Sequence, residues 1–174
     1  MQKNGMQRAA CLLATAAGLM ASSLYAQQPA GMQASFGGDV ATLSDKFTGL
    51  ARVLDGKYDY RPGQGVRSTA DVLNLIVMEN GMLAGVLTGA APGPRPAPVT
   101  DPAKLQDALK NSYANLRKVI DGLSESDLNT SVKMFGRDTT KRGAIQMALT
   151  DQHEHLGQLI AYSRVNGIVP PWSK

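Results

Sequence analysis

Four segments of this 174-residue chain repeat apolar residues at intervals of three and four positions. Such spacing places the apolar side chains along one stripe of an α-helix, and that stripe has to be buried against other elements. No segment alternates apolar and polar residues convincingly, so we expect no β-strand. The four stripes run over residues 40–54, 72–87, 105–123 and 145–165. Four helices with one stripe each predict an all-α four-helix bundle, which we place at residues 38–174.

Loop-forming residues separate the predicted helices. The stretch GAAPGPRPAPVTDP, between the second and third helices, is rich in proline. Proline lacks a backbone N–H and blocks both helical and ladder hydrogen bonds, so this stretch predicts a loop or an extended crossover. Ser68 or Thr69 is a suitable cap for the second helix, and Thr139 or Thr140 for the fourth.

The first 26 residues have the features of a secretory signal peptide. Lys3 and Arg8 form a charged start, an apolar stretch of small residues follows, and Ala26 suits the position before a cleavage site. The alternative is an uncleaved membrane anchor, but the apolar stretch is short for a membrane span and no second one follows. We therefore predict a periplasmic or secreted protein without membrane contact after cleavage, in which residues 27–37 form a flexible leader.

Charge and cysteine content narrow the classes of function. Cleavage removes two of the 18 basic residues and none of the 14 acidic ones, so the formal net charge falls from +4 to about +2. No cluster of basic residues with interleaved aromatics occurs, so we expect no nucleic-acid binding. The single cysteine, Cys11, lies inside the signal peptide, which leaves the mature chain without a disulfide or a Cys-based metal site.

Glu79 is the most unusual residue of the predicted bundle. A helical wheel at about 100° per residue places it almost at the centre of the apolar stripe of the second helix. A carboxylate at such a position is costly to bury unless it is paired, protonated or bound to a metal ion. Two interpretations stay open, because Glu79 either meets a polar partner or borders a cleft, or else takes part in a functional site.

The two histidines of the chain lie close together in the segment DQHEHL. Their directions on a helix differ by about 160°, so His153 and His155 cannot bind one ion from the same helix. Asp151 and His155 are four residues apart and lie one turn above the other. This pair is either a surface hydrogen bond or, if Glu79 faces the same cavity, part of a site for one divalent ion such as Zn, Ni, Fe or Mn. Water bound to such an ion can become a nucleophile.

Two longer stretches resemble the DinB-like family. EHLGQLIAYSRVNGIVPPWS, at residues 154–173, resembles the last helix and closing segment of that family. YDYRPGQGVRSTADVLNLIVMENGMLAGVLTGA, at residues 58–90, resembles its first connector and second helix. The resemblance covers most of residues 36–173. It implies an up-down-down-up four-helix bundle in which the Pro-rich stretch is a long crossover.

The same resemblance implies where a metal would bind. Many family members hold a divalent metal through three histidines, one on the second helix and two that lie four residues apart on the last. His155 matches the last of these ligands, whereas Asp151 and Leu75 stand at the positions of the other two. Glu79 lies one turn beyond Leu75 on the same face. The metal site of the family is therefore either rebuilt from Glu79, Asp151 and His155 or abandoned.

Three functions are compatible with the sequence. The first is an exported DinB-like bundle that binds a divalent metal or a small ligand in its central cleft. The second is a metal-dependent hydrolase or thiol transferase, the latter an activity of some family members, with His155 as ligand or base. The third is a non-catalytic structural or interaction protein, such as a homodimer, whose cleft is vestigial. No GxSxG, HExxH or CxxC motif and no Gly-rich phosphate loop points to another chemistry.

Overall fold

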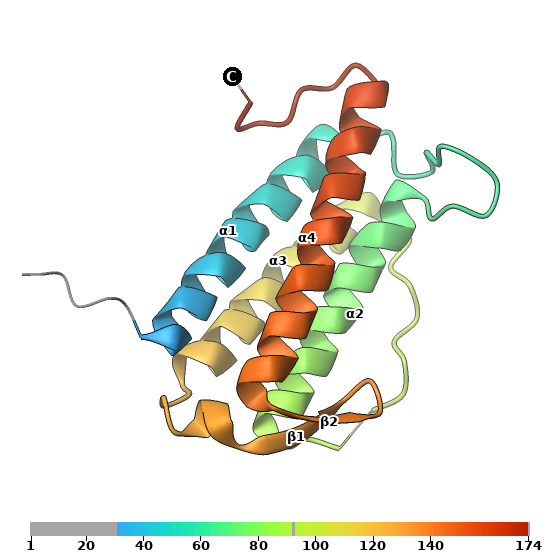
Figure 1. The fold of residues 1–174 in the computed structure, drawn as a ribbon. Helices are drawn as coiled ribbons and strands as arrows, with labels where there is room; N and C mark the ends of the chain where they lie inside the picture. The colour runs from blue at the N-terminus through green and yellow to red at the C-terminus, as the bar shows by residue number, and fades with distance from the viewer. Residues whose placement is uncertain (1–30, 92, 174) are drawn as a thin grey trace, which may run out of the picture.

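The computed structural model describes residues 31–91 and 93–173, and over these residues the chain forms a bundle of helices with a small hairpin at one end (Figure 1). The predicted signal peptide at 1–26 lies outside the described residues. The elements are α1 (Met32–Val53), α2 (Thr69–Thr88), α3 (Pro102–Asp121), a short 3-10 helix (Asp127–Asn129), β1 (Ser131–Met134), β2 (Arg137–Thr140) and α4 (Lys141–Val165). The prediction of a mostly helical fold with four helices is confirmed.

The first helix begins earlier than its apolar stripe indicated. Residues 27–37 were predicted to form a flexible leader, yet α1 begins at Met32, so the prediction is wrong for residues 32–37. Contacts with α3 explain the difference. The Gln33 side chain donates to the Ile120 carbonyl (3.0 Å), and Arg117 Nη1 donates to the Gly37 carbonyl (2.9 Å). A Cβ atom at Gly37 would lie 2.8 Å from Asp121 Oδ1, so this glycine permits a close approach of the two helices.

Contacts between α1 and α4 show that these helices run in the same direction. Asp39, in the first half of α1, bonds to His153 of α4 at 3.0 Å. Gly49, further along α1, lies against Pro171, which follows α4, with 3.4 Å between an added Cβ atom and the proline Cγ. Residues later in α1 therefore contact residues later in the chain around α4, so the two helices are parallel. The closing segment of the chain folds back onto α1.

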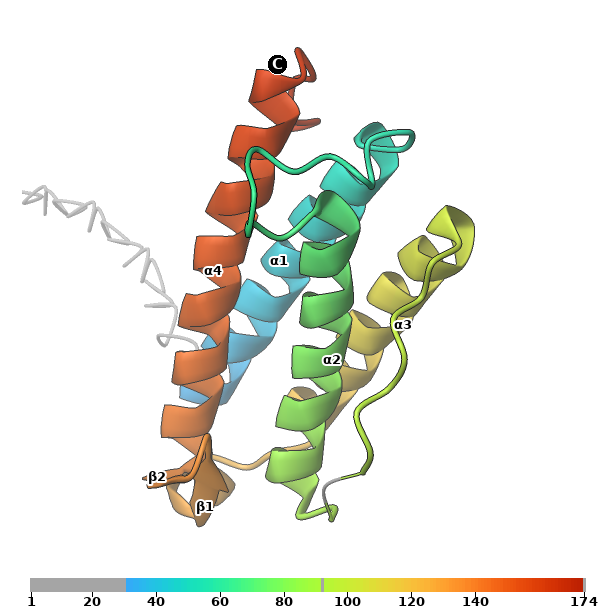
Figure 2. The ribbon, with the colours of Figure 1, turned by 90° about the vertical axis from the view of Figure 1, so that its right-hand side faces the viewer.

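The second and third helices also run in the same direction, because the crossover between them returns along the bundle (Figure 2). Val99, at the end of the crossover, donates to Asn74 Oδ1 near the start of α2 (2.7 Å), and Asn74 Nδ2 donates back to the Val99 carbonyl (3.1 Å). Further along both helices, Asn80 Nδ2 donates to Ser112 Oγ (3.0 Å). The Pro-rich stretch is thus an extended crossover, as its composition predicts.

A two-stranded hairpin between α3 and α4 contradicts the expectation of no β-strand. β1 and β2 pair antiparallel, with Met134 opposite Arg137. Phe135 and Gly136 form the turn with φ of 51° and 76°, which is the conformation of a two-residue hairpin loop. Periodicity missed these strands because each has four residues and only Met134 is buried in the core. Thr140 ends the hairpin and caps α4, accepting from the Gly143 N–H as predicted for this position.

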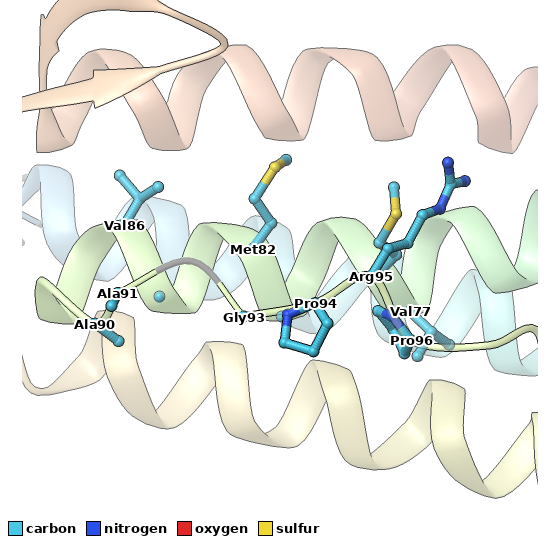
Figure 3. A pocket seen from close by; sticks show the side chains of 12 residues that line it. Val77, Met82, Val86, Ala90, Ala91, Gly93, Pro94, Arg95 and Pro96 are labelled. Atoms are coloured by element: carbon cyan, nitrogen blue, oxygen red, sulfur yellow. The ribbon is translucent and has the colours of Figure 1, made fainter.

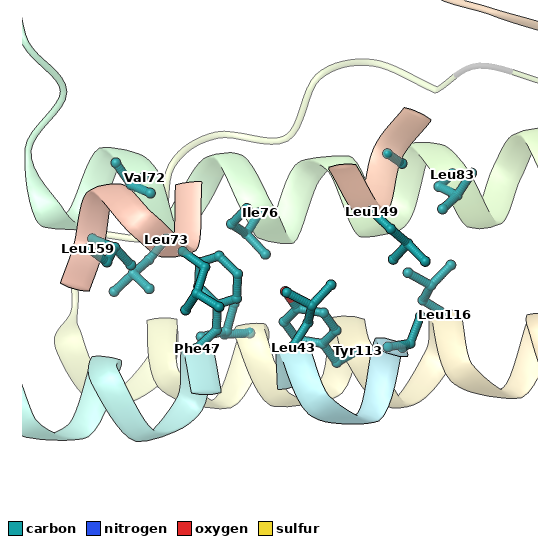
Figure 4. Packing of buried hydrophobic residues seen from close by; sticks show 14 of the residues in the cluster. Leu43, Phe47, Val72, Leu73, Ile76, Leu83, Tyr113, Leu116, Leu149 and Leu159 are labelled. Atoms are coloured by element: carbon teal, nitrogen blue, oxygen red, sulfur yellow. The ribbon is translucent and has the colours of Figure 1, made fainter. Parts of the chain in front are cut away.

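The core contains side chains from all four helices (Figure 4). Its fully buried members include Leu43 and Phe47 of α1, Leu73 and Ile76 of α2, Tyr113 and Leu116 of α3, and Leu159 of α4. Most of these residues lie on the apolar stripes that the sequence predicted. Leu73 and Tyr113 are the exceptions, since neither was assigned to its stripe. The packing of the four stripes therefore fixes which face of each helix points inward, and so where polar residues on those stripes lie.

Among the described residues, α2 is the one helix that is long and apolar enough to cross a membrane by length and composition alone. The expectation that no second apolar stretch of this length follows the signal peptide is therefore wrong for α2. The apolar character of α2 has a simpler physical cause, because this helix packs on both α3 and α4 and buries side chains toward each. A core helix of this kind carries apolar residues around most of its circumference.

Ser68 caps α2, and removing its hydroxyl should destabilise the protein. The Ser68 side chain accepts from the Asp71 N–H, and the Asp71 carboxylate accepts from the Ser68 N–H (2.9 Å). These hydrogen bonds also hold the pKa of Asp71 below its usual value. Replacing Ser68 with alanine should lower the free energy of unfolding by about 1–2 kcal/mol. Urea denaturation measures this, and Ser35→Ala, which changes an exposed serine in α1, should have a much smaller effect.

Candidate metal centre

Glu79, Asp151 and His155 come together between α2 and α4. One potential ligand atom from each residue lies within 4.8 Å of the other two. Nε2 of His155 lies 3.7 Å from Oδ2 of Asp151, as expected for side chains four residues apart on one helix. Glu79 reaches them from α2. The structure brings these three predicted residues together, and as a group they could hold a metal ion.

The carboxylate of Glu79 lacks the partner that its burial requires. The residue is 8% exposed, and its Oε2 atom is buried without a hydrogen bond. Burial, followed by the negative charge of the neighbouring Asp151, raises the pKa of Glu79 to about 8, and the charge of Arg67 opposes this shift. An ionised carboxylate in this position needs a compensating positive charge, because an unpaired buried charge is strongly unfavourable. A proton or a metal ion supplies that compensation.

Hydrogen bonds beside His155 fix the proton on its ring. The Tyr162 hydroxyl donates to the Arg67 carbonyl (2.9 Å), so it accepts from Gln158 Nε2 (2.7 Å). Gln158 therefore turns its carbonyl oxygen toward His155 Nδ1, at 3.1 Å. Nδ1 of the neutral ring is then the donor, which leaves the lone pair of Nε2 directed toward Asp151. Metal-binding histidines commonly show this arrangement, in which the second ring nitrogen donates to a neighbouring oxygen.

The other histidine takes no part in this site. His153 Nε2 lies 3.0 Å from Asp39 Oδ1, and the two side chains are 46% and 37% exposed. This pair connects α4 to α1, on a different side of α4 from His155. The prediction that the two histidines of the HEH segment cannot share one ion is therefore confirmed by the separate partners that they contact.

A buried chain of amide and hydroxyl groups holds α2, α3 and α4 in register next to the site. The Tyr113 hydroxyl donates to Gln152 Oε1 (3.0 Å), and Gln152 Nε2 donates to Asn80 Oδ1 (2.8 Å). Burial raises the pKa of Tyr113 well above its usual value, which keeps the hydroxyl proton in place. Gln152 and Asn80 directly follow the two carboxylates of the site in sequence. This series of hydrogen bonds therefore sets the position of Glu79 relative to Asp151 along the helix axes.

Comparison with known proteins places the chain in a family. The family model of the DinB superfamily matches residues 13–159. The chain belongs to the DinB superfamily. Its structure is similar to the crystal structure of a DinB-like protein from Bacillus subtilis, with a TM-score of 0.66 and 20% sequence identity, over 80% of this chain and 97% of that one. No curated protein matches the chain. The family predicted from the closing segment and the second helix is thus confirmed.

The residues that come together here differ from the three histidines that the resemblance to the family implies. Leu75, at the position where the resemblance implies the first histidine, is half-buried and lines a cavity along α2. Glu79, one turn further, supplies the carboxylate that completes the group with Asp151 and His155. Sequence reasoning found these three residues, but it missed Gln158 and Tyr162. The signal that could have found them is the spacing of Gln158 and Tyr162 after His155, three and seven residues later on one helical face.

Proposed function

We propose that this protein is an exported member of the DinB superfamily, with the up-down-down-up bundle of that family, that binds one divalent metal ion between α2 and α4. Residues 1–26 would act as a signal peptide that directs the chain to the periplasm or the outside of the cell. Support for export comes from the charged start, the apolar stretch and the small residues before position 27. The ligands would be Glu79, Asp151 and His155.

The buried, unpartnered Oε2 atom of Glu79 is the observation that supports metal binding most strongly. A buried polar atom without a hydrogen bond costs stability, and a bound cation removes that cost. The neighbouring ligand atoms are suitable, because a neutral His155 that donates from Nδ1 to Gln158 presents Nε2 as a ligand, and Asp151 adds a carboxylate. One imidazole and two carboxylates suit Zn, Fe, Mn or Ni and leave coordination positions for water or a small ligand.

Titration of the chelator-treated protein with each of these four ions, followed by calorimetry, tests the proposal. We expect one ion per chain with a dissociation constant in the micromolar range or below. Glu79→Gln and His155→Ala should each weaken binding by more than tenfold, because each removes a ligand. Gln158→Leu should weaken it by about 10–100-fold, because it removes the hydrogen bond that orients the ring.

His153→Ala is the matched control, since it removes the other histidine from the same helix and leaves the site intact. This variant should bind metal with unchanged affinity. Equal losses of affinity in His153→Ala and His155→Ala, or the absence of binding for all four ions at micromolar concentration, would contradict the proposal.

A further inference from the structure

A cavity separate from the metal centre lies between the outer face of α2 and the crossover. Its volume is about 420 Å³, within the range of small-molecule sites. Figure 3 shows the crossover passing across α2, with Met82 and Val86 of the helix and Arg95 of the crossover around the space. The part of α2 that lines the cavity, residues 77–86, is about 14 Å long. Its lining is apolar apart from Arg95.

The crossover spans this cavity as a stiff strap, which we define as residues 93–98. Pro94, Pro96 and Pro98 alternate with other residues, and each proline fixes its own φ and cannot donate a hydrogen bond. The backbone hydrogen bonds that anchor the crossover lie on either side of the strap, at Ala90 and Val99. The strap is therefore held at both ends above α2, which keeps the space beneath it open.

Two glycines in the middle of α2 have no packing role in the described structure. A Cβ atom at Gly81 or Gly85 would meet nothing within 4 Å, and neither residue has a positive φ. Glycine inside a helix is unfavourable relative to alanine, so its presence here calls for another explanation. Both glycines line the cavity, and their missing side chains are what enlarge it.

A second cavity of about 280 Å³ continues the first along α2, and four residues, including Met78 and Arg95, line both. Arg67 also lines the second cavity. In the described part of the chain, neither arginine forms an ion pair. The carboxylate of Asp71 lies there too, but Arg61 at 3.6 Å and the Ser68 N–H already engage it. The continuous space is thus apolar at one end. Its other end has two arginines against one carboxylate, that of Asp71, whose pKa the charge of Arg67 also lowers.

We infer that the space beneath the strap binds a small amphipathic carboxylate, such as a free medium-chain fatty acid. The acyl chain lies along α2 over Gly81 and Gly85, in contact with Met82. The carboxylate lies between the guanidinium groups of Arg67 and Arg95. Each guanidinium group can donate two parallel hydrogen bonds to a carboxylate. The three ligands of the metal centre do not line either cavity. Arg67 lies close to both sites, since its charge also lowers the pKa of Glu79.

Calorimetric titration with monomeric decanoate and with decanol tests the inference on the protein obtained from the full chain. We expect one decanoate per chain, bound at least tenfold more tightly than decanol. Gly85→Leu fills the apolar end, so it should weaken binding of both compounds at least tenfold. The double variant Arg67→Gln/Arg95→Gln should weaken decanoate binding at least tenfold while leaving decanol binding unchanged.

The controls separate loss of the site from loss of the fold. Gly85→Leu should have an equal or higher midpoint of thermal unfolding, because leucine favours the helix and its Cβ atom meets no neighbour. Gly38→Leu, at an exposed and equally open glycine of α1, should bind decanoate normally. Three results would overturn the inference. They are no decanoate binding by the unaltered protein, decanoate binding by Gly85→Leu with unchanged affinity, or binding of the unaltered protein to phospholipid vesicles but not to monomeric decanoate.

Discussion

Replacing Gln152 with leucine should lower the free energy of unfolding by about 3 kcal/mol. Gln152 is fully buried, and it accepts from the Tyr113 hydroxyl and donates to Asn80. Leucine fills a similar volume but leaves both of these polar groups unpaired in the core. Each unsatisfied buried group costs about 1–3 kcal/mol, which is large against a typical domain stability of about 5–15 kcal/mol. Chemical denaturation measures the change.

Two further variants test whether this loss comes from the hydrogen bonds. Gln146→Leu alters an exposed glutamine of the same helix and should change stability by less than about 0.5 kcal/mol. Tyr113→Phe should be destabilising on its own, yet nearly neutral in the Gln152→Leu background, where the hydroxyl has already lost its acceptor. Additive losses from the two substitutions would show that Tyr113 and Gln152 do not act as a pair.

The Glu79→Gln variant should be more stable than the unaltered protein at pH 8.5 by up to about 4–5 kcal/mol when metal is absent. The pKa of Glu79 is about 8 in the folded state, against 4.5 as its ordinary value. Between these values the folded state binds the proton and the unfolded state does not. Stability therefore falls as pH rises from about 4.5 to 8, and glutamine, which stays neutral, removes this fall.

Unfolding free energies measured from pH 4 to pH 9 in the presence of chelator isolate this effect. The relevant quantity is the difference between Glu79→Gln and the unaltered protein at each pH. The difference should be near zero at pH 4, should grow through pH 8 and should then level off. Glu154→Gln, at an exposed carboxylate of α4, should show no comparable pH dependence. A Glu79→Gln curve that runs parallel to that of the unaltered protein at all pH values would mean that Glu79 is not protonated on folding.

The helices and the family could be predicted from the sequence, because both depend on local patterns. The stripes that contain Leu43, Ile76, Leu116 and Leu159 are the ones that form the core. The hairpin could not be predicted in this way, since its strands are short and stabilised by pairing with each other. The start of α1 was missed for a related reason. Gly37 indicates flexibility when read alone, whereas in the structure it permits contact with α3.

The candidate site was partly predictable. Glu79 was recognisable because a carboxylate on an apolar stripe violates the pattern of its own helix. Asp151 and His155 were recognisable as a pair because they are four residues apart on one helix. The distance between Glu79 and the other two residues depends on how α2 and α4 are aligned. That alignment is set by the hydrogen bond from Gln152 to Asn80, a contact between residues 72 positions apart in the sequence. No local pattern contains such information.

Metal content tests the central claim most directly. It is measured on protein purified from the native host without added metal and without metal-affinity steps. Elemental analysis should find close to one divalent metal ion per chain in the unaltered protein and almost none in Glu79→Gln. His153→Ala, produced in the same way, should retain its metal. An unaltered protein free of metal, or a Glu79→Gln variant with the same metal content as the unaltered protein, would contradict the assignment of Glu79, Asp151 and His155 as ligands.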